Sequence, residues 1–426
     1  MKKVGCAILS FLLAVSLSIP AFADSDSMLV PIVTSNALPF QDTKNTWCED
    51  AVQTCYQTGL LAGKTATRFD AKSHLTYAQI IVIAARLYTG LTGGAPIADP
   101  AEGQAWYQPS YNLLAGLVKH PEQVNDYNSG DIRLVSRWFM EEPGTANQSC
   151  MRFNFIDLLL FVLENAKVSL PVLNQLTAST PDIGSGSDCF SLYESGILNG
   201  SDEYGTLHSG RFLTREQAAA ILARVVDPAQ RLHFSLKTFN QCRDILGMEP
   251  STVLVTVDGR DITAEQCSDD ICRALRKQYN RLMCDGPSAN DLTAVVPDVL
   301  TAIKTDLALE ALADQEGVTA TEAELAKACG SDLPGYKGMT AAGWHWEKLH
   351  GLLGDGLRSI YEDRYGNENL GSSPMSVGDT PGSEVLDSAL EELASTMTVE
   401  QSSALKSLDL AAAQARLAAG PDNIGD

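Results

Sequence analysis

The chain has 426 residues, of which 45% are hydrophobic, and a formal net charge of −22 at pH 7. This length predicts two or three domains, and the apolar content is enough for folded cores, which excludes a wholly disordered protein. The acidic balance argues against nucleic acid or an anionic membrane as a general partner, because both require a basic face.

The first residues are typical of an export signal. Two lysines precede an apolar run at residues 4–19, and Ala21-Phe22-Ala23 supplies the small residues that a signal peptidase reads. The run is shorter than the roughly 20 residues that a membrane span needs. We therefore expect residues 1–23 to be a cleaved signal peptide, with a retained N-terminal anchor as the alternative. No later stretch has the length and hydrophobicity of a span, so we predict a secreted protein with no transmembrane segment after cleavage.

The ten cysteines include one in the signal segment, which leaves nine in the mature chain, so at least one thiol has no partner within the chain. Cys48 and Cys55 lie about 10 Å apart along a predicted helix, which is too far for a disulfide. Cys267, Cys272 and Cys284 lack CxxC spacing, and we interpret them as buried small apolar residues rather than a metal or redox site.

Three stretches of the first half share one order of features: an aspartate, a helix that ends at a glycine-flanked turn, a loop, and a second helix. Two of them span residues 38–87 and 180–224. The third lies between them, around Asp99 and Trp106, and carries a long polar loop at about residues 120–149. Each unit has an apolar stripe that it cannot bury alone, so we expect the three to pack on one another.

Local signals mark the turns and helix starts of these units. Gly63 and Gly200 suit the left-handed residue that stops a helix. The segments Thr76–Gln79 and Thr214–Gln217 fit capping boxes at the start of the second helix. In the middle unit, Met151 stands where the others have a threonine.

Repeat character stops after Arg231, and residues 233–251 are expected to form a connecting helix and linker. Asp258-Gly259, between two β-type runs, predicts a tight hairpin turn. The segment Thr263–Gln266 predicts a capped helix, and a long helix from about Pro297 with two further helices should follow.

The C-terminal residues are Gly-, Ser- and Asp-rich at first and then alanine-rich and acidic. We expect residues 367–426 to form a linker, at about 366–382, and an acidic tail. A solvated helix or partly disordered tail is the first interpretation, and a partner-docking helix is the alternative.

The helix starts of the first half resemble the S-layer homology family, whose mark is a Thr-Arg-Ala-Glu tetrad at the start of the second helix. Thr214-Arg215-Glu216-Gln217 is the best match. The resemblance covers about residues 38–232 and implies repeats at 38–95, 96–170 (degenerate, with the long loop) and 178–232. It implies a pseudo-threefold helical module that binds secondary cell-wall polysaccharide, which is often pyruvylated, in grooves between the repeats.

The same resemblance implies which residues contact the polymer. In this family the tetrad arginine reaches the anionic sugar, and the early aspartate and tryptophan help to build the groove. A guanidinium fork suits a carboxylate, and helix-start N–H groups favour anions. The residues carried over are Arg215, Thr214, Glu216, Arg152, Asp42, Trp47, Asp182 and Trp106.

This chain departs from the family pattern in each repeat. Tyr77 replaces the arginine in the first, Met151 the threonine in the second, and the third has no tryptophan near Ser187. We therefore expect a strong anionic-sugar site around Arg215 and a weaker one near Arg152, with the Tyr77 repeat as scaffold. Core packing of both tryptophans, and solvent exposure of Arg215 as an ordinary helix-start residue, remain open alternatives.

Residues 252–366 resemble the N-terminal chaperone domain of SurA-type and lipoprotein-foldase proteins, relatives of trigger factor. The hairpin Val257-Asp258-Gly259-Arg260-Asp261-Ile262-Thr263 matches their Val-x-Gly-x-x-Ile-Thr mark, and residues 317–324 match the turn after their long helix. The resemblance implies binding of unfolded exported polypeptides without a catalytic group. The chain leaves no room here for the parvulin prolyl-isomerase domain that such proteins often insert.

The predicted fold is mainly α: a pseudo-threefold helical module, then a mostly helical chaperone-like domain with a small β-hairpin. No GxSxG, P-loop, dinucleotide or HExxH pattern is present, and His345 and His350 fall on different helix faces. We predict a non-enzymatic protein of a bacterial cell wall or S-layer, with no cofactor or metal. The alternatives are a purely structural S-layer or envelope component and, last, a degenerate peptidyl-prolyl isomerase.

Overall fold

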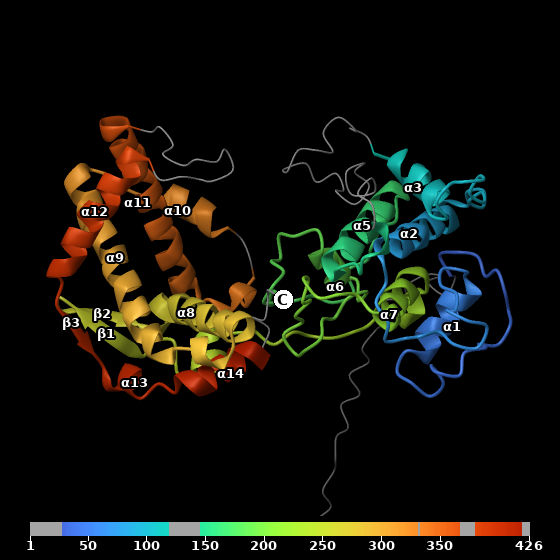
Figure 1. Cartoon of the computed structure of the whole chain (residues 1–426), viewed down its shortest axis with the longest axis horizontal. Coiled ribbons are helices and arrows are strands. Elements are labelled where there is room, and N and C mark those ends of the chain that lie inside the picture. Colours follow the sequence, from blue (N-terminus) through green and yellow to red (C-terminus); the bar gives the residue numbers. More distant parts are fainter. Residues whose placement is uncertain (1–27, 119–144, 331–332, 367–379, 420–426) are drawn as a thin grey trace, which may run out of the picture.

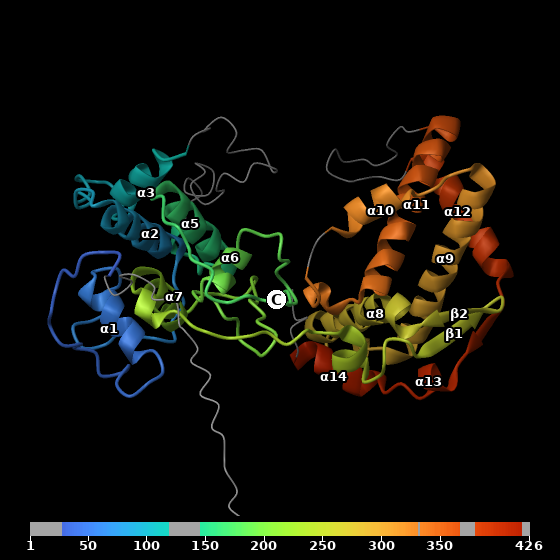
Figure 2. The ribbon, with the colours of Figure 1, turned by 180° about the vertical axis from the view of Figure 1, so that it is seen from behind.

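The computed structural model describes residues 28–118, 145–330, 333–366 and 380–419, which form two lobes with separate hydrophobic cores (Figures 1 and 2). Both lobes are mainly helical, and the second contains a small antiparallel sheet, which confirms the predicted mainly-α class. The signal-peptide prediction and most of the predicted long loop lie outside the described residues. Among the described ones, we find no helix with the length and hydrophobicity of a membrane span.

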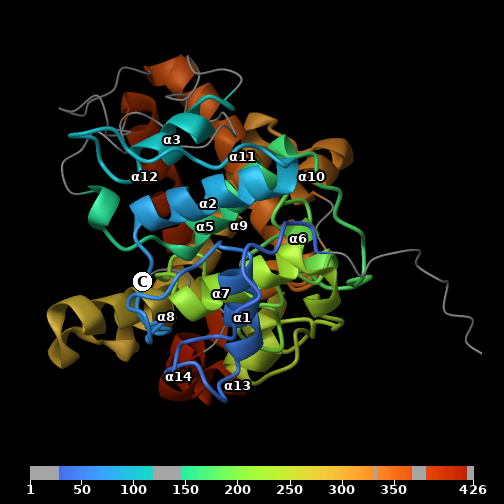
Figure 3. The ribbon, with the colours of Figure 1, turned by 90° about the vertical axis from the view of Figure 1, so that its right-hand side faces the viewer.

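The first lobe contains three helix pairs, one for each stretch with the shared order of features. In Figure 3, α1 lies beside α7 and α3 beside α2, so the first helix of one pair packs on the second helix of another. Short 3₁₀ turns, η3 (Thr145–Asn147) and η4 (Pro228–Gln230), flank the pairs. The pairs are α1 (Glu49–Gln57) with α2 (Tyr77–Thr92), α3 (Gln108–Ala115) with α5 (Arg152–Asn165), and α6 (Phe190–Glu194) with α7 (Arg215–Val226).

A closed ring of backbone hydrogen bonds joins the segments that lead into α2, α5 and α7. The N–H of Leu75 donates to the carbonyl of Leu213 (3.0 Å), that of Leu213 to Cys150 (3.0 Å), and that of Cys150 back to Leu75 (2.8 Å). All three side chains are fully buried. Each segment therefore donates to one neighbour and accepts from the other, which gives the lobe approximate threefold symmetry.

The predicted helix stops are displaced by four residues. α1 ends at Gln57 and α6 at Glu194, so the left-handed residues that follow them are Gly59 (φ 71°) and Gly196 (φ 74°) rather than Gly63 and Gly200. Gly63 is needed for a different reason, since a Cβ there would lie 2.2 Å from the Phe40 ring. Close approach, not helix termination, explains this glycine.

The second lobe begins earlier than expected. The π-helical turn η5 (Gln241–Leu246) falls in the predicted linker, yet its Cys242 and Leu246 and the preceding Phe239 are buried in the second core. Hydrogen bonds from Ser179 N–H to the Pro334 carbonyl and from Lys337 N–H to the Pro181 carbonyl, both 2.9 Å, also join the lobes.

A hairpin and a set of long helices form the centre of the second lobe. The predicted Asp258-Gly259 turn is confirmed, and both residues are left-handed (φ 48° and 82°), as a two-residue hairpin turn requires. The hairpin strands are β1 (Val253–Val257) and β2 (Arg260–Thr263). They are followed by α8 (Ala264–Asp285), η6 (Pro287–Ala289), η7 (Leu292–Ala294), α9 (Val295–Glu316), α10 (Glu322–Cys329), η8 (Tyr336–Gly338) and α11 (Ala341–Tyr365).

The acidic C-terminal segment is an integral part of the second lobe rather than a solvated tail. It adds a third strand, so that the sheet order is β2-β1-β3, with Val255 opposite Gln401 and Val257 opposite Val399. Its helices cover the sheet and α8 or pack on α9 and α11, and they bury Leu405 and Leu417. The elements are α12 (Pro381–Thr396), β3 (Val399–Gln401), α13 (Ser403–Lys406) and α14 (Leu410–Ala419).

Leu417→Ala tests whether the C-terminal segment belongs to the core of the second lobe. Leu417 is 2% exposed, so its truncation should lower the free energy of unfolding by about 3 kcal/mol, as for a core leucine. Val385→Ala, at a residue 39% exposed, is the control and should change little. Equal urea-unfolding curves for the two variants would show that the tail does not contribute to the core.

Candidate functional site

Each second helix of the first lobe starts against a loop of another unit, and we call these contacts the α7, α2 and α5 seams. In the α7 seam, Arg215 N–H donates to the Ser73 carbonyl (3.0 Å). In the α2 seam, Tyr77 N–H donates to Gln148 (3.1 Å). In the α5 seam, Arg152 N–H donates to the Arg211 carbonyl (2.8 Å). The seams are therefore equivalent in backbone geometry and differ in their side chains.

The predicted capping boxes are formed at two of the three seams. In α7, the Thr214 hydroxyl accepts from Gln217 N–H (3.4 Å), and the Gln217 side chain accepts from Thr214 N–H (3.1 Å). Thr76 and Gln79 form the same box in α2. Met151, at the start of α5, makes no side-chain cap. The caps stabilise helix starts and leave the α7 seam with a rigid backbone.

Arg215 is 8% exposed, and its guanidinium binds the backbone of the first unit. Its Nε donates to the Phe69 carbonyl (3.0 Å) and its Nη2 to the Ala62 carbonyl (2.6 Å), while its guanidinium carbon lies 4.5 Å from the centre of the Phe69 ring. Burial lowers the pKa of Arg215. The structure thus gives Arg215 the role of fixing the 62–70 loop, and its direct contact with a sugar stays a prediction.

Asp42 holds the same loop from the other side. Its two carboxylate oxygens accept from Phe69 N–H (2.8 Å) and Asp70 N–H (2.7 Å). Burial alone would raise the pKa of Asp42, but these two bonds hold it below its ordinary value. Asp70 is left-handed (φ 65°), a conformation that this double bond stabilises. Asp42 and Arg215 therefore hold one peptide group from both ends, the aspartate at the Asp70 N–H and the arginine at the Phe69 carbonyl.

The α5 seam repeats this grip with different residues. Asp182 accepts from Leu207 N–H (2.9 Å) and His208 N–H (2.7 Å), while Arg152 Nη1 donates to the Leu207 carbonyl. Arg152 is as buried as Arg215, and burial lowers its pKa and raises that of Asp182. The family resemblance implies contact of Asp182 and Arg152 with the polymer, which stays a prediction, and in the structure both side chains hold a loop as Asp42 and Arg215 do.

The two candidate tryptophans lie on the surface. Trp47 is 61% exposed and Trp106 is 52% exposed, which excludes core packing for both. Trp47 belongs to the α7 seam, because α1 packs on α7 and the charge of Glu216 adds to burial in raising the pKa of the adjacent Cys48. Trp106 precedes α3, which packs on α2, and so belongs to the α2 seam.

The α7 seam presents further exposed groups that the sequence did not single out. Glu216 pairs with Lys72 (2.7 Å), whose side chain is 80% exposed. The rings of His74 and Phe212 lie 5.4 Å apart, and Phe212 is 47% exposed. Lys72, His74 and Phe212 precede the cap of their own unit and come together only through packing between units, so no local signal identifies them.

Among the described residues, no group of three or more His, Cys, Asp or Glu side chains could hold a metal. The cysteines in these ranges form no disulfide, and seven are buried, including Cys267 and Cys272. Cys284 is exposed, contrary to our expectation of a buried residue. It lies near the end of α8, where the helix extends past the core.

A family model described as the S-layer homology domain matches residues 39–81, from just before Asp42 into α2. No curated protein matches the chain. The match identifies an S-layer homology domain in this part of the first lobe and indicates attachment to the cell wall or envelope. The other two units and the second lobe lie outside it.

Substituting Arg215 by alanine should destabilise the first lobe, because it leaves the buried Phe69 carbonyl and the Ala62 carbonyl without a charged donor. We expect a loss of about 3 kcal/mol in the free energy of unfolding. Arg211→Ala removes an exposed arginine of the same lobe and should have little effect. An Arg215→Ala protein as stable as wild type would mean that the loop does not depend on this grip.

Proposed function

We propose that the first lobe holds the protein non-covalently on secondary cell-wall polysaccharide through the α7 seam. The S-layer homology match supports attachment to the wall. The observation that carries the choice of seam is that, among the described residues, only this seam combines an exposed tryptophan with an arginine-headed helix. The α2 seam has Trp106 but Tyr77, whose hydroxyl donates to Asn154 (3.0 Å), and the α5 seam has Ser187 at the tryptophan position.

Side chains, rather than helix-start N–H groups, would bind an anionic sugar here. The first three N–H groups of α7 already donate, to Ser73, to Ala71 and to the Thr214 hydroxyl. The exposed Lys72 ammonium and the Trp47 ring offer a cation and a stacking face, and such pairs suit a sugar that carries a carboxylate. Arg215 and Asp42 then act as positioning residues for the loop that carries Lys72.

Trp47→Ala tests the seam without disturbing the core. We expect wall binding to fall about tenfold, which corresponds to one aromatic contact of about 1.5 kcal/mol. Sedimentation with purified cell walls measures it. Trp106→Ala and Val172→Ala are matched controls at residues 52% and 58% exposed, and both should bind as wild type. Loss of binding in Trp106→Ala with Trp47→Ala unaffected would move the site to the α2 seam.

We propose that the second lobe binds unfolded exported polypeptides. The order of its elements supports this function: a hairpin, a capped helix, the long α9, and α10 capped by Thr321 and Glu324 follow the arrangement of the chaperone domains that residues 252–366 resemble. The alternative is a structural envelope component in which this lobe mediates assembly.

The mature chain from residue 24 should slow the aggregation of a chemically denatured client at equimolar ratio. The second lobe would bind the apolar segments that the denatured client exposes. A fragment that ends near residue 370 is not a fair test, since it lacks β3 and α14 of the same core. Light scattering measures the effect, with an equal amount of an unrelated acidic protein as control. Unchanged client aggregation together with self-association of the chain would favour the structural alternative.

A further inference from the structure

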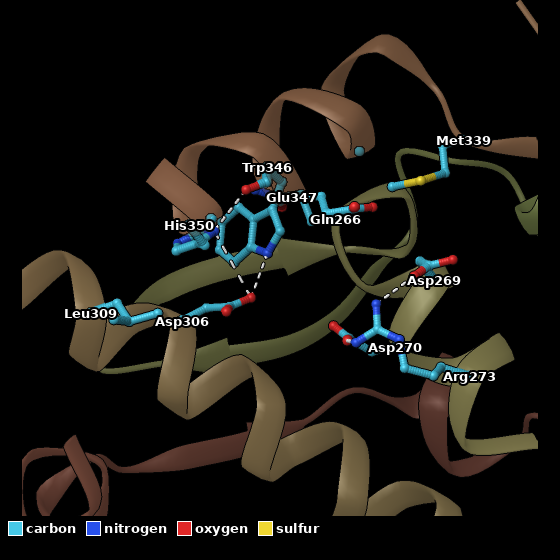
Figure 4. A pocket seen from close by; sticks show the side chains of 12 residues that line it. Gln266, Asp269, Asp270, Arg273, Asp306, Leu309, Met339, Trp346, Glu347 and His350 are labelled. Atoms are coloured by element: carbon cyan, nitrogen blue, oxygen red, sulfur yellow. Dashed lines mark hydrogen bonds and ion pairs between the residues drawn. The ribbon is translucent and has the colours of Figure 1, made fainter. Parts of the chain in front are cut away.

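The helices α8, α9 and α11 line a cavity of about 240 Å³ whose wall carries four carboxylates (Figure 4). Trp346 and His350 reach it from α11, and a single arginine, Arg273, reaches it from α8. In this wall, carboxylates from three helices therefore face two groups that can carry a positive charge, Arg273 and His350. The acidic residues of the wall are Asp269, Asp270, Asp306 and Glu347.

The contacts of His350 require a charged imidazole. It is 5% exposed, its Nδ1 lies 2.8 Å from the Trp346 carbonyl, and its Nε2 lies 3.0 Å from Glu310 Oε1. A carbonyl and an ionised carboxylate only accept hydrogen bonds, so both ring nitrogens must carry a hydrogen. Burial alone would lower the pKa of His350, but the bond to Glu310 and the charge of Asp306 raise it above the ordinary value.

Glu310 is ionised in this arrangement and connects three elements. Besides His350 of α11, it binds both guanidinium nitrogens of Arg260 in β2, at 2.6 and 3.2 Å. The bond from His350, together with those from Arg260, lowers the pKa of Glu310 to about 2. We call this contact between α11 and α9 the His350 clip.

Asp270 and Asp306 share their positively charged neighbours with other carboxylates, since His350 lies 3.9 Å from Asp306 but also binds Glu310. Asp270 is bonded by Arg273 Nη1 (3.1 Å), but the same guanidinium also binds Asp269 (2.5 Å). Asp306 accepts from Trp346 Nε1 (2.8 Å). Burial, and then the charge of Asp306, raise the pKa of Asp270 to about 7, and burial raises that of Asp306.

We propose that the His350 clip and the Asp270–Asp306 pair form a pH-sensitive switch, which holds α11 on α8 and α9 in mildly acidic conditions and loosens it above neutral pH. The inference concerns regulation of the second lobe and does not depend on what that lobe binds. The charged groups that face the cavity or the clip are Asp269, Asp270 and Arg273 of α8, Asp306 and Glu310 of α9, Glu347, Lys348 and His350 of α11, and Arg260 of β2.

The two components act in the same direction. A histidine with a raised pKa stabilises the fold fully below its unfolded pKa, and this contribution is lost as pH rises through the folded value. An aspartate with a raised pKa adds a penalty that is absent below its unfolded pKa and grows until the folded value, here about 7 for Asp270. The pKa values of Glu310 and Asp269 are lowered, so their stabilisation is lost only in stronger acid.

The helix that the switch would release, α11, has a large apolar face. Leu353, Leu357 and Tyr361 of α11 form a buried cluster with α9 and α12. Trp346, which is 6% exposed, lines the cavity on the same helix and reports on its surroundings by fluorescence. If the second lobe binds polypeptides, release of α11 would make that binding depend on pH.

Hydrogen exchange of the intact mature chain, corrected for intrinsic rates, tests the switch. Between pH 5.5 and 8.5 we expect exchange in residues 341–353 to rise about tenfold, as the contacts that hold α11 are lost. His350→Gln cannot become a cation and should exchange fast already at pH 5.5. His345→Gln, at an exposed position of the same helix, should keep the wild-type profile.

Asp270→Asn removes the acid component without loss of volume and keeps the histidine component, so its exchange should rise less between pH 5.5 and 8.5 than that of the wild-type chain. Protection that is constant with pH in the wild-type chain would overturn the proposal. Equal profiles for His350→Gln and His345→Gln, or an Asp270→Asn chain that loosens as the wild type does, would overturn it as well.

Discussion

The backbone groups of three residues at the centre of the first lobe determine where everything else in that lobe lies. The ring formed by Leu75, Cys150 and Leu213 ties together segments that are up to 138 residues apart in the chain. Because each segment runs directly into a helix, the ring fixes the starts of α2, α5 and α7 against loops of neighbouring units. The seams follow from this geometry, and each is built from two units that are distant in sequence.

The buried aspartates and arginines serve this geometry. Asp42 and Arg215 bind the two ends of the peptide group between Phe69 and Asp70, and Asp182 and Arg152 do the same between Leu207 and His208. Such charged groups are costly to bury unless every bond is made, so their pairing with backbone gives the loops one conformation. The residues free to meet a polymer are then the exposed ones beside the grip, and our proposed function rests on them.

The second lobe contains buried charges in a different arrangement. Its charges are also buried, but around Asp270 and His350 the positive and negative groups are not matched, and their protonation is therefore sensitive to pH. A scaffold of fully bonded charges and a cavity of poorly matched ones occur in one chain. The first suits a fixed anchor, and the second suits a part that moves.

Local signals in the sequence predicted local structure well. The threonine caps and the Asp258-Gly259 turn depend on neighbours within a few residues, and the structure confirms them. The strand β3 could not be predicted in this way, because Gln401 pairs with Val255, and nothing near either residue encodes the partner.

The candidate site, too, could be predicted from the sequence only in part. The family resemblance indicated Arg215 and Asp42, but not that each would bind backbone from its side of a loop. Phe212 and Lys72 enter the α7 seam only through packing between units. For His350, the spacing argument correctly separated it from the exposed His345, while its partner Glu310 lies on another helix.

The central claim is that the α7 seam, and Trp47 in it, meets the wall polymer. Fluorine NMR of the chain labelled with 5-fluorotryptophan tests it most directly, because the five tryptophans give few signals and Trp47→Phe assigns one of them. On addition of fragments of secondary cell-wall polysaccharide, our account predicts a shift of the Trp47 signal and none of the Trp106 signal. A shift at Trp106 with Trp47 unchanged would contradict it.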